Sequence, residues 1–138
     1  MKLSARNQFK GTVTKVQRGA VNGIVSLETT AGVITGTISL SAIDELGLEP
    51  GVKAVAIIKA TEVMVGLGEM RLSARNQLKG TVASVKDGAV NGIVTLDVAG
   101  GNKVTSTISM NAIKDLELVP GKEATAVIKA TSVMFGVE

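Results

Sequence analysis

The chain consists of one sequence module written twice, and this duplication limits the possible folds more than any other feature. Residues 3–28 are identical to residues 72–97 at 19 of 26 positions. Residues 37–67 are identical to residues 107–137 at 18 of 31 positions. Between these blocks the second copy carries one extra residue, and such insertions are tolerated best at the tip of a hairpin. A duplication of this kind predicts two similar structural units.

The size of the repeat predicts that the two units depend on each other. Each copy has about 69 residues, and a unit of that size builds only a marginal hydrophobic core. We assign the first unit to residues 1–67 and the second to residues 72–138, with residues 68–71 as a linker. Because so short a linker keeps the copies close, we expect them to pack against each other or against other chains.

The residue types that the chain lacks exclude several classes of chemistry. It has no Cys, which excludes disulfides and thiolate metal sites, and no His, which removes the commonest transition-metal ligand and general base. Its only aromatic residues are two Phe, so the core must consist mainly of aliphatic side chains, as suits tightly packed β-structure. No paired carboxylates are evident, and we therefore expect a protein that is not an enzyme.

Charge and hydropathy favour a cytoplasmic protein with a small anionic ligand. The net charge is +3, from 15 basic and 12 acidic residues, which suits a small anion better than a long polyanion. The repeat begins directly after Met1, so we expect no signal peptide. The most apolar run, residues 52–68, is broken by charged side chains and is not a membrane span. We expect neither nucleic acid nor membrane as a partner.

Turn signals at regular spacing divide each copy into short strands. In the first copy we expect strands at residues 10–17, 24–28 and 33–39, and at residues 52–65 either one long strand or two shorter ones. Five short, mostly antiparallel strands with one small helix are typical of an OB-type barrel. The expected fold class is all-β, with two tandem OB-like five-stranded barrels that each carry one short helix.

A short helix is expected at residues 41–47. Ser41 suits the N-cap, acidic residues follow in the first turns, and Gly47 suits a left-handed C-terminal position. In the second copy Asn111 stands in place of Ser41, and Asn is also a good N-cap. The preceding motif Gly-Ala-Val-Asn-Gly, at residues 19–23, contains an Asn-Gly turn signal. It predicts a hairpin loop whose glycines permit a positive φ, or alternatively a nest of backbone N–H groups for an anion.

Three short motifs in each copy offer hydrogen-bond donors that suit an anion. The head of the module places Ser4 two residues before Arg6, the helix start offers Ser41 and free backbone N–H groups, and Lys59 lies in an apolar strand. Each motif alone has a simpler explanation: an ion pair for the arginine, helix capping for the serine, and protection of a strand edge for the lysine. Together they contain only donors, which favours a tetrahedral oxyanion over a cation.

The motifs follow one another in an order that resembles a known family. They are Ser-Ala-Arg-Asn-Gln, Lys-Gly-Thr-Val, Gly-Ala-Val-Asn-Gly, Ser-Ala-Ile-x-x-Leu-Gly-Leu and Ile-Lys-Ala-Thr-x-Val-Met. This series resembles the Mop module, a TOBE-like molybdate-binding module, and the whole chain resembles a di-Mop molbindin. The resemblance implies OB-like barrels that bind molybdate, and tungstate as well, for intracellular molybdenum storage and homeostasis. It also implies a homo-oligomer, a trimer of two-module chains around a three-fold axis.

The resemblance also implies which residues bind the oxyanion. In the family, one module provides the Ser-x-Arg head of a main site, and its neighbour provides the helix start and the strand lysine. In this chain the main-site residues are then Ser4, Arg6, Ser41, Ala42, Lys59, Ser73, Arg75, Asn111, Ala112 and Lys129. A secondary site near the three-fold axis involves Ala20, Val21, Asn22, Ala89, Val90 and Asn91. Asn111 departs from the serine of the pattern, although its amide is still a donor.

Other functions stay open beside oxyanion storage. An OB-type barrel also suits single-stranded nucleic acid, although such proteins stack bases on aromatic side chains, of which this chain has few. Alternatively, the chain senses an oxyanion and acts through a protein partner, because it has neither a helix-turn-helix nor a P-loop of its own. The same shortage of aromatic residues leads us to expect no organic cofactor such as a pterin.

Overall fold

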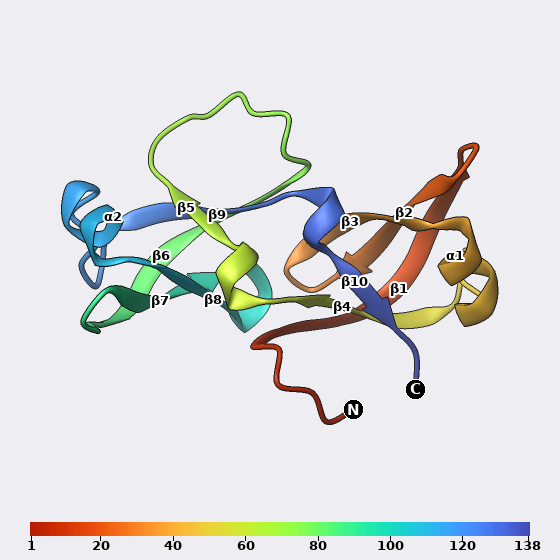
Figure 1. The fold of residues 1–138 in the computed structure, drawn as a ribbon, viewed down its shortest axis with the longest axis horizontal. Coiled ribbons are helices and arrows are strands. Elements are labelled where there is room, and N and C mark those ends of the chain that lie inside the picture. The colour runs from red at the N-terminus through yellow and green to blue at the C-terminus, as the bar shows by residue number, and fades with distance from the viewer.

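The computed structural model describes residues 1–138 and contains two five-stranded sheets (Figure 1). The first copy of the repeat forms β1 (Asn7–Arg18), β2 (Asn22–Thr29), β3 (Gly32–Ser39), α1 (Leu40–Leu46), β4 (Lys53–Ile58), the 3-10 turn η1 (Ala60–Glu62) and β5 (Met64–Gly66). The second copy forms β6 (Asn76–Lys86), β7 (Asn91–Val98), η2 (Ala99–Gly101), β8 (Asn102–Ser109), α2 (Met110–Asp115), β9 (Glu123–Ile128), η3 (Ala130–Ser132) and β10 (Met134–Gly136). All strand pairings are antiparallel. The expected all-β fold of two OB-like barrels, each with one short helix, is confirmed.

The last strand of each copy belongs to the sheet of the other copy. The strand order is β10-β4-β1-β2-β3 in one sheet and β5-β9-β6-β7-β8 in the other. Met134 of β10 pairs with Ile57 of β4, and Met64 of β5 pairs with Val127 of β9. The linker at residues 68–71 therefore separates the two sequence repeats but not the two sheets, because β5 and β10 cross between them.

A single turn of 3-10 helix directs the chain toward the other sheet. After β4, the backbone N–H of Glu62 donates to the carbonyl of Lys59 at 2.9 Å, and that of Val63 donates to Ala60 at 3.3 Å. Equivalent bonds form η3 in the second copy. The long strand expected over residues 52–65 is thus divided in two, and this division lets the last strand leave its own sheet.

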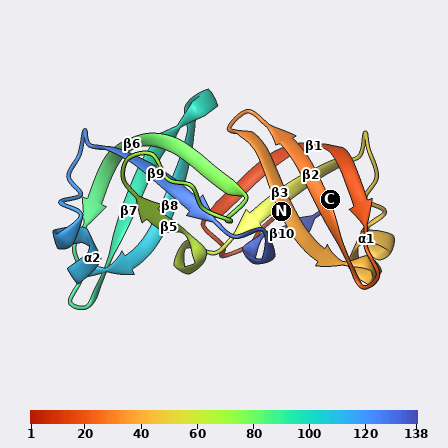
Figure 2. The same ribbon diagram turned by 90° about the horizontal axis from the view of Figure 1, so that it is seen from above.

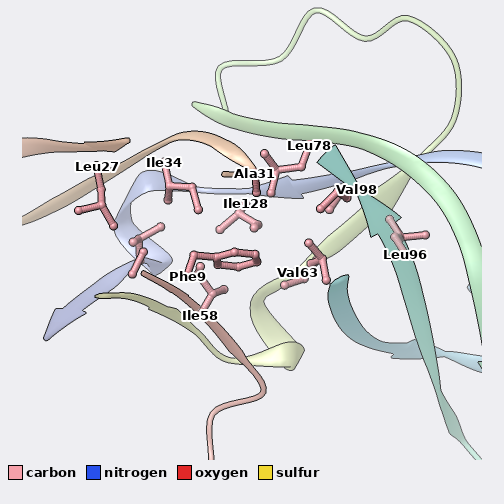
Figure 3. Packing of buried hydrophobic residues seen from close by; sticks show 14 of the residues in the cluster. Phe9, Leu27, Ala31, Ile34, Ile58, Val63, Leu78, Leu96, Val98 and Ile128 are labelled. Atoms are coloured by element: carbon pink, nitrogen blue, oxygen red, sulfur yellow. The ribbon is translucent and has the colours of Figure 1, made fainter. Parts of the chain in front are cut away.

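The two copies share one hydrophobic core. Twenty-five buried residues from both copies form a single cluster. Figure 3 shows its centre, where Phe9 and Val63 of the first copy lie near Ile128 of the second. As expected from the marginal size of one copy, each copy supports the other.

Both phenylalanines lie in the first sheet, on either side of the same alanine. Phe9 of β1 and Phe135 of β10 each pair with Ala56 of β4, and both side chains are buried. The corresponding row of the second sheet contains Leu78, Ala126 and Val65. The first row therefore carries larger side chains and needs more room from the strand that faces it.

Gly36 of β3 provides this room. A Cβ atom at Gly36 would lie 2.5 Å from Cε2 and 2.8 Å from Cζ of Phe135. The second copy has Ser106 at the same position, and its fully buried hydroxyl donates to the carbonyl of Val63 at 2.6 Å. Each sheet is therefore shaped for the strand that it receives: β10 with Phe135 fits beside a glycine, and β5 with Val65 fits beside a serine.

The extra residue of the second copy lies at a hairpin tip, as expected. It falls in η2, where Gly100 has a φ of 71° that an L side chain rarely adopts. This tip touches the equivalent tip of the first copy, because the side-chain amide of Asn102 donates to the hydroxyl of Thr30 at 2.9 Å. The insertion therefore adds a contact between the copies.

The predicted N-caps of both helices are wrong by two residues. The N-cap of α1 is Ser39 rather than Ser41, and its hydroxyl accepts a hydrogen bond from the N–H of Ala42 at 3.1 Å. In α2 the N-cap is Ser109 rather than Asn111. The expected acidic residues are also missing from the first turn of α1.

A tertiary contact explains the earlier helix start. The N–H of Leu40 donates to the carbonyl of Val21 in the β1–β2 turn at 3.0 Å, which aligns the chain for helix from that residue. The predicted C-terminus of α1 is correct, because Gly47 lies in the left-handed region with φ 64°.

The Asn-Gly pair does not form the β1–β2 turn that the sequence predicts. Arg18 already pairs with Gly23, and the turn is closed by the N–H of Gly19, which donates to the carbonyl of Asn22 at 2.8 Å. Neither glycine has a positive φ. Glycine at position 23 instead leaves room for α1, since a Cβ atom there would lie 2.4 Å from Cδ1 of Ile43.

Candidate functional site

Two grooves form where the head of each copy meets the end of a strand. In the β1–β4 pair, Asn7 lies opposite Ile58. Because the strands are antiparallel, Arg6, just before Asn7, comes to lie across from Lys59, just after Ile58. The same register recurs between β6 and β9 in the second copy. Strand pairing alone therefore brings an arginine and a lysine together in each copy.

Each groove is lined by a Ser-Ala-Arg head, by the Lys-Ala-Thr segment of the same copy, and by a methionine from the exchanged strand of the other copy. The first groove has a volume of about 430 Å³ and the second about 450 Å³. The first groove contains Ser4, Arg6, Lys59 and Met134, and the second contains their counterparts Ser73, Arg75, Lys129 and Met64. Six of the predicted main-site residues thus meet in two equivalent groups.

The grooves are cationic and contain no acidic side chain. The ion pairs of the structure involve other residues, so Arg6, Lys59, Arg75 and Lys129 are not neutralised within the chain. The simpler explanation of Arg6, an ion pair with an acid, therefore does not hold. Two unpaired cations beside a hydroxyl are an arrangement that an oxyanion with two negative charges would stabilise.

A glutamine side chain binds the backbone of each head. The side-chain amide of Gln8 donates to the carbonyls of Leu3 and Ala5, at 3.2 Å and 3.0 Å, on either side of Ser4. In the second copy Gln77 donates only to the carbonyl of Ala74, at 3.5 Å. The first head is therefore held by more contacts than the second.

The helix starts lie apart from the grooves. Ser41, Ala42, Asn111 and Ala112 line neither groove. Their helices stand at opposite ends of the molecule (Figure 2). The chain therefore does not unite the predicted main-site residues: it places each lysine with the head of its own copy, whereas the resemblance places the lysine with the helix start of a neighbour.

The predicted secondary-site residues lie beside the helix starts. The turn of Ala20, Val21 and Asn22 contacts α1 through the Val21 carbonyl, and the turn of Ala89, Val90 and Asn91 contacts α2 through the Val90 carbonyl. Val21 and Val90 are each 74% exposed. Each end of the molecule thus combines a helix start with an exposed apolar turn.

Sequence reasoning missed several residues that shape the grooves. Met64 and Met134 reach them only because the last strands are exchanged, and Thr107 of β8 lines the first groove from the other copy. Asn7 and Asn76 are buried beside the grooves. The two asparagines did carry a signal, since both copies keep Asn directly after the arginine of the head.

Comparisons with known proteins agree with the double module. A family profile described as the TOBE domain matches residues 3–65 and again residues 72–135. The chain is 41% identical over 142 residues to the molybdenum transport protein ModE of Herbaspirillum seropedicae, and 41% identical over 138 residues to the molybdenum-pterin-binding protein MopA of Rhodobacter capsulatus. These matches cover 100% and 98% of this chain but 52% of each relative, so the chain spans about half the length of these two proteins.

Of two further proteins, one matches a single copy of the module and the other matches both copies. A probable molybdenum-pterin-binding protein of Haemophilus influenzae is 61% identical over 69 residues, which are 50% of this chain and 100% of that protein. The crystal structure of the cytoplasmic molybdate-binding protein ModG with molybdate bound matches over 100% of both chains, with a TM-score of 0.97 and 43% identity. The arrangement of both copies is therefore shared with ModG.

The structure shows no sign of a cation site. No three His, Cys, Asp or Glu residues lie close enough together to hold a metal ion. Neither α1 nor α2 combines the length and the apolar character that crossing a lipid bilayer requires.

Proposed function

Because the chain belongs to the TOBE-domain family and contains two copies of the domain, we propose that it binds molybdate as a free oxyanion. The observation that carries this proposal is the pair of grooves in which Arg, Lys and Ser meet without an acidic side chain. The match to ModG, a molybdate-binding protein, supports it. Tungstate has the same charge and tetrahedral shape, so we propose that it binds as well.

The chemistry of the groove suits a tetrahedral dianion. Arg6 and Lys59 offer charge-assisted hydrogen bonds, which are about twice as strong as neutral ones, and the hydroxyl of Ser4 adds a neutral donor. Sulfate has the same charge and shape but is smaller. Selection against sulfate must therefore come from the size of the completed cavity, since charge does not distinguish the two ions.

We propose that a second copy of the chain completes each site, in a trimer around a three-fold axis. The grooves lie near the junction of the two copies and the helix starts lie at the ends, so one chain cannot join Arg6 to Ser41 (Figure 1). Apolar side chains are exposed at both places, including Leu3 at the first groove and Val21 at one end. Contact between a groove and an end of another chain would bury these side chains while adding Ser41 and Ala42 to the donor set.

We further propose that the protein stores and buffers molybdate in the cytoplasm and is not an enzyme. The groove residues are donors that hold an anion, and the argument for catalysis would need a nucleophile beside a base. ModG, which matches along its whole length, is described as cytoplasmic.

Calorimetric titration of the purified oligomer tests the proposal. Molybdate and tungstate are expected to bind, and sulfate to bind at least tenfold more weakly, which corresponds to about 1.4 kcal/mol. Elemental analysis together with the native mass gives the number of ions per oligomer. Equal affinity for sulfate, or no binding of any of the three ions, would contradict oxyanion storage.

A sensing role is the second candidate, because this chain spans only about half of ModE, a molybdenum transport protein. It predicts that a defined partner protein is recovered with the chain only when molybdate is present. Nucleic-acid binding is disfavoured, since Phe9 and Phe135 are both buried and neither side chain is free to stack on a base. A gel shift with single-stranded oligonucleotides at low salt is expected to be negative.

A further inference from the structure

We propose that Asn7 and Asn76 are positioning residues, each of which fixes the arginine and lysine of one groove against the sheet of the other copy. This inference rests on the proposed oxyanion binding and concerns residues that lie behind the groove rather than in it. Neither asparagine lines a groove, and both side chains are only 2% exposed.

Each asparagine uses both its amide nitrogen and its amide oxygen in contacts with the other copy. The amide nitrogen of Asn7 donates to the carbonyl of Thr105 at 2.8 Å, and its amide oxygen accepts from the N–H of Thr105 at 2.8 Å. Asn76 makes the same pair of 2.8 Å bonds with Thr35. The side chain thus imitates a neighbouring strand, and the contact crosses between copies in both directions.

Each asparagine is close in the backbone to the arginine and the lysine of its groove. Asn7 directly follows Arg6, and its strand partner Ile58 directly precedes Lys59. In the second copy, the amide nitrogen of Asn76 also donates to the carbonyl of Ile128, the residue before Lys129, at 3.2 Å. One buried side chain therefore ties the arginine-bearing strand to the lysine-bearing strand and to the other copy.

The same contact sets the far wall of the first groove. Thr105, which Asn7 binds, stands two residues before Thr107 on β8, and alternate residues of a strand face the same side. Thr107 lines the first groove together with Arg6 and Lys59, and it comes from the other copy. Loss of the Asn7 clamp would let the distance between this wall and the two cations vary, which weakens the binding of a small rigid ion more than it weakens the core.

Calorimetric titration of full-length variants with sodium molybdate tests this role. Asn7→Ala and Asn76→Ala remove the clamps without adding charge near the anion. Each is combined with Lys59→Ala or Lys129→Ala, so that one groove at a time keeps its lysine. Val25→Ala and Val94→Ala, at equivalent buried positions of the two copies, control for a general loss of stability. All titrations are made well below the unfolding temperature of each variant, and Asn→Ser replaces Asn→Ala if an alanine variant does not fold.

The expected result is selective for one groove. When only Lys129 remains, Asn76→Ala lowers the molybdate affinity at least tenfold and Asn7→Ala lowers it less than twofold, and the pattern reverses when only Lys59 remains. A purely structural role would instead affect both grooves alike and would be copied by the valine variants. If the wild-type protein binds molybdate and the asparagine variants bind it equally well, this inference is wrong. Wild-type protein that binds no oxyanion overturns the proposed function.

Discussion

The fit between Phe135 and Gly36 makes a quantitative prediction about the exchanged strands. In Gly36→Ser the new Cβ would lie 2.5 Å from the phenyl ring, so the ring must move by about 1 Å to reach ordinary contact. Overpacking of this kind costs about 1–3 kcal/mol. With an unfolding entropy of about 2.1 cal/mol/K per residue over 138 residues, the transition temperature should fall by about 3–10 °C.

Phe135→Val should partly reverse this loss of stability when it is combined with Gly36→Ser. Phe135→Val alone leaves a cavity beside Gly36 and costs about 2–3 kcal/mol, somewhat less than the roughly 3–5 kcal/mol of a Phe→Ala change. The double variant places serine and valine together, which is the combination that Ser106 and Val65 already form in the other sheet. By analogy with the Ser106–Val63 bond, we expect the new hydroxyl to donate to the carbonyl of Val133.

Urea denaturation of the wild type, the two single variants and the double variant measures the coupling between the two positions. We expect the loss in free energy of unfolding of the double variant to be at least 1 kcal/mol smaller than the sum of the two single losses. Ser106→Gly with Val65→Phe provides the matched cycle in the second sheet and should show coupling of the same sign. Additive losses, or a Gly36→Ser variant as stable as wild type, would refute the fit as the reason for the asymmetry.

Two more predictions concern the helix starts and the groove lysines. Ser39→Ala removes an N-cap and should destabilise the protein by about 1 kcal/mol in thermal unfolding, whereas Ser41→Ala should leave stability unchanged and lower only the molybdate affinity of the assembled oligomer. Lys59→Ala and Lys129→Ala each remove a charge-assisted bond of about 1.5–3 kcal/mol, so each should weaken molybdate binding about ten- to a hundredfold by calorimetry. Because Asn111 replaces the serine at one helix start, the two losses should differ, and identical losses would count against a role for that position.

The sequence was sufficient to predict the elements of each copy, because a repeat shows the same turn signals twice. It was not sufficient to predict which sheet receives the last strand. Residues 64–66 and 134–136 read Met-Val-Gly and Met-Phe-Gly, and both patterns suit either sheet. Gly36 and Ser106, which lie far away in the chain, fit the two exchanged strands, one by leaving room for Phe135 and the other by a hydrogen bond to Val63.

The sequence was sufficient to predict only part of the candidate site, again because some contacts join residues that are far apart in the chain. Arg6 and Lys59 meet because of strand register, which a motif search finds without knowing the cause. The N-cap at Ser39 was missed because two serines compete for that position and a tertiary bond to Val21 decides between them. The buried role of Asn7 was missed because its partner, Thr105, belongs to the other copy.

The exchange of last strands also affects how the protein matures on the ribosome. The sheet that begins with β1 is complete only when β10 arrives, since Met134 pairs with Ile57. The first copy therefore emerges with one edge of β4 unpaired and must wait for most of the second copy to be synthesised. Exposed edges of this kind attract other chains, so nascent copies on one messenger are at risk of trading strands with their neighbours. Ribosomes spaced widely along the messenger would keep nascent chains apart and protect the pairing within one molecule.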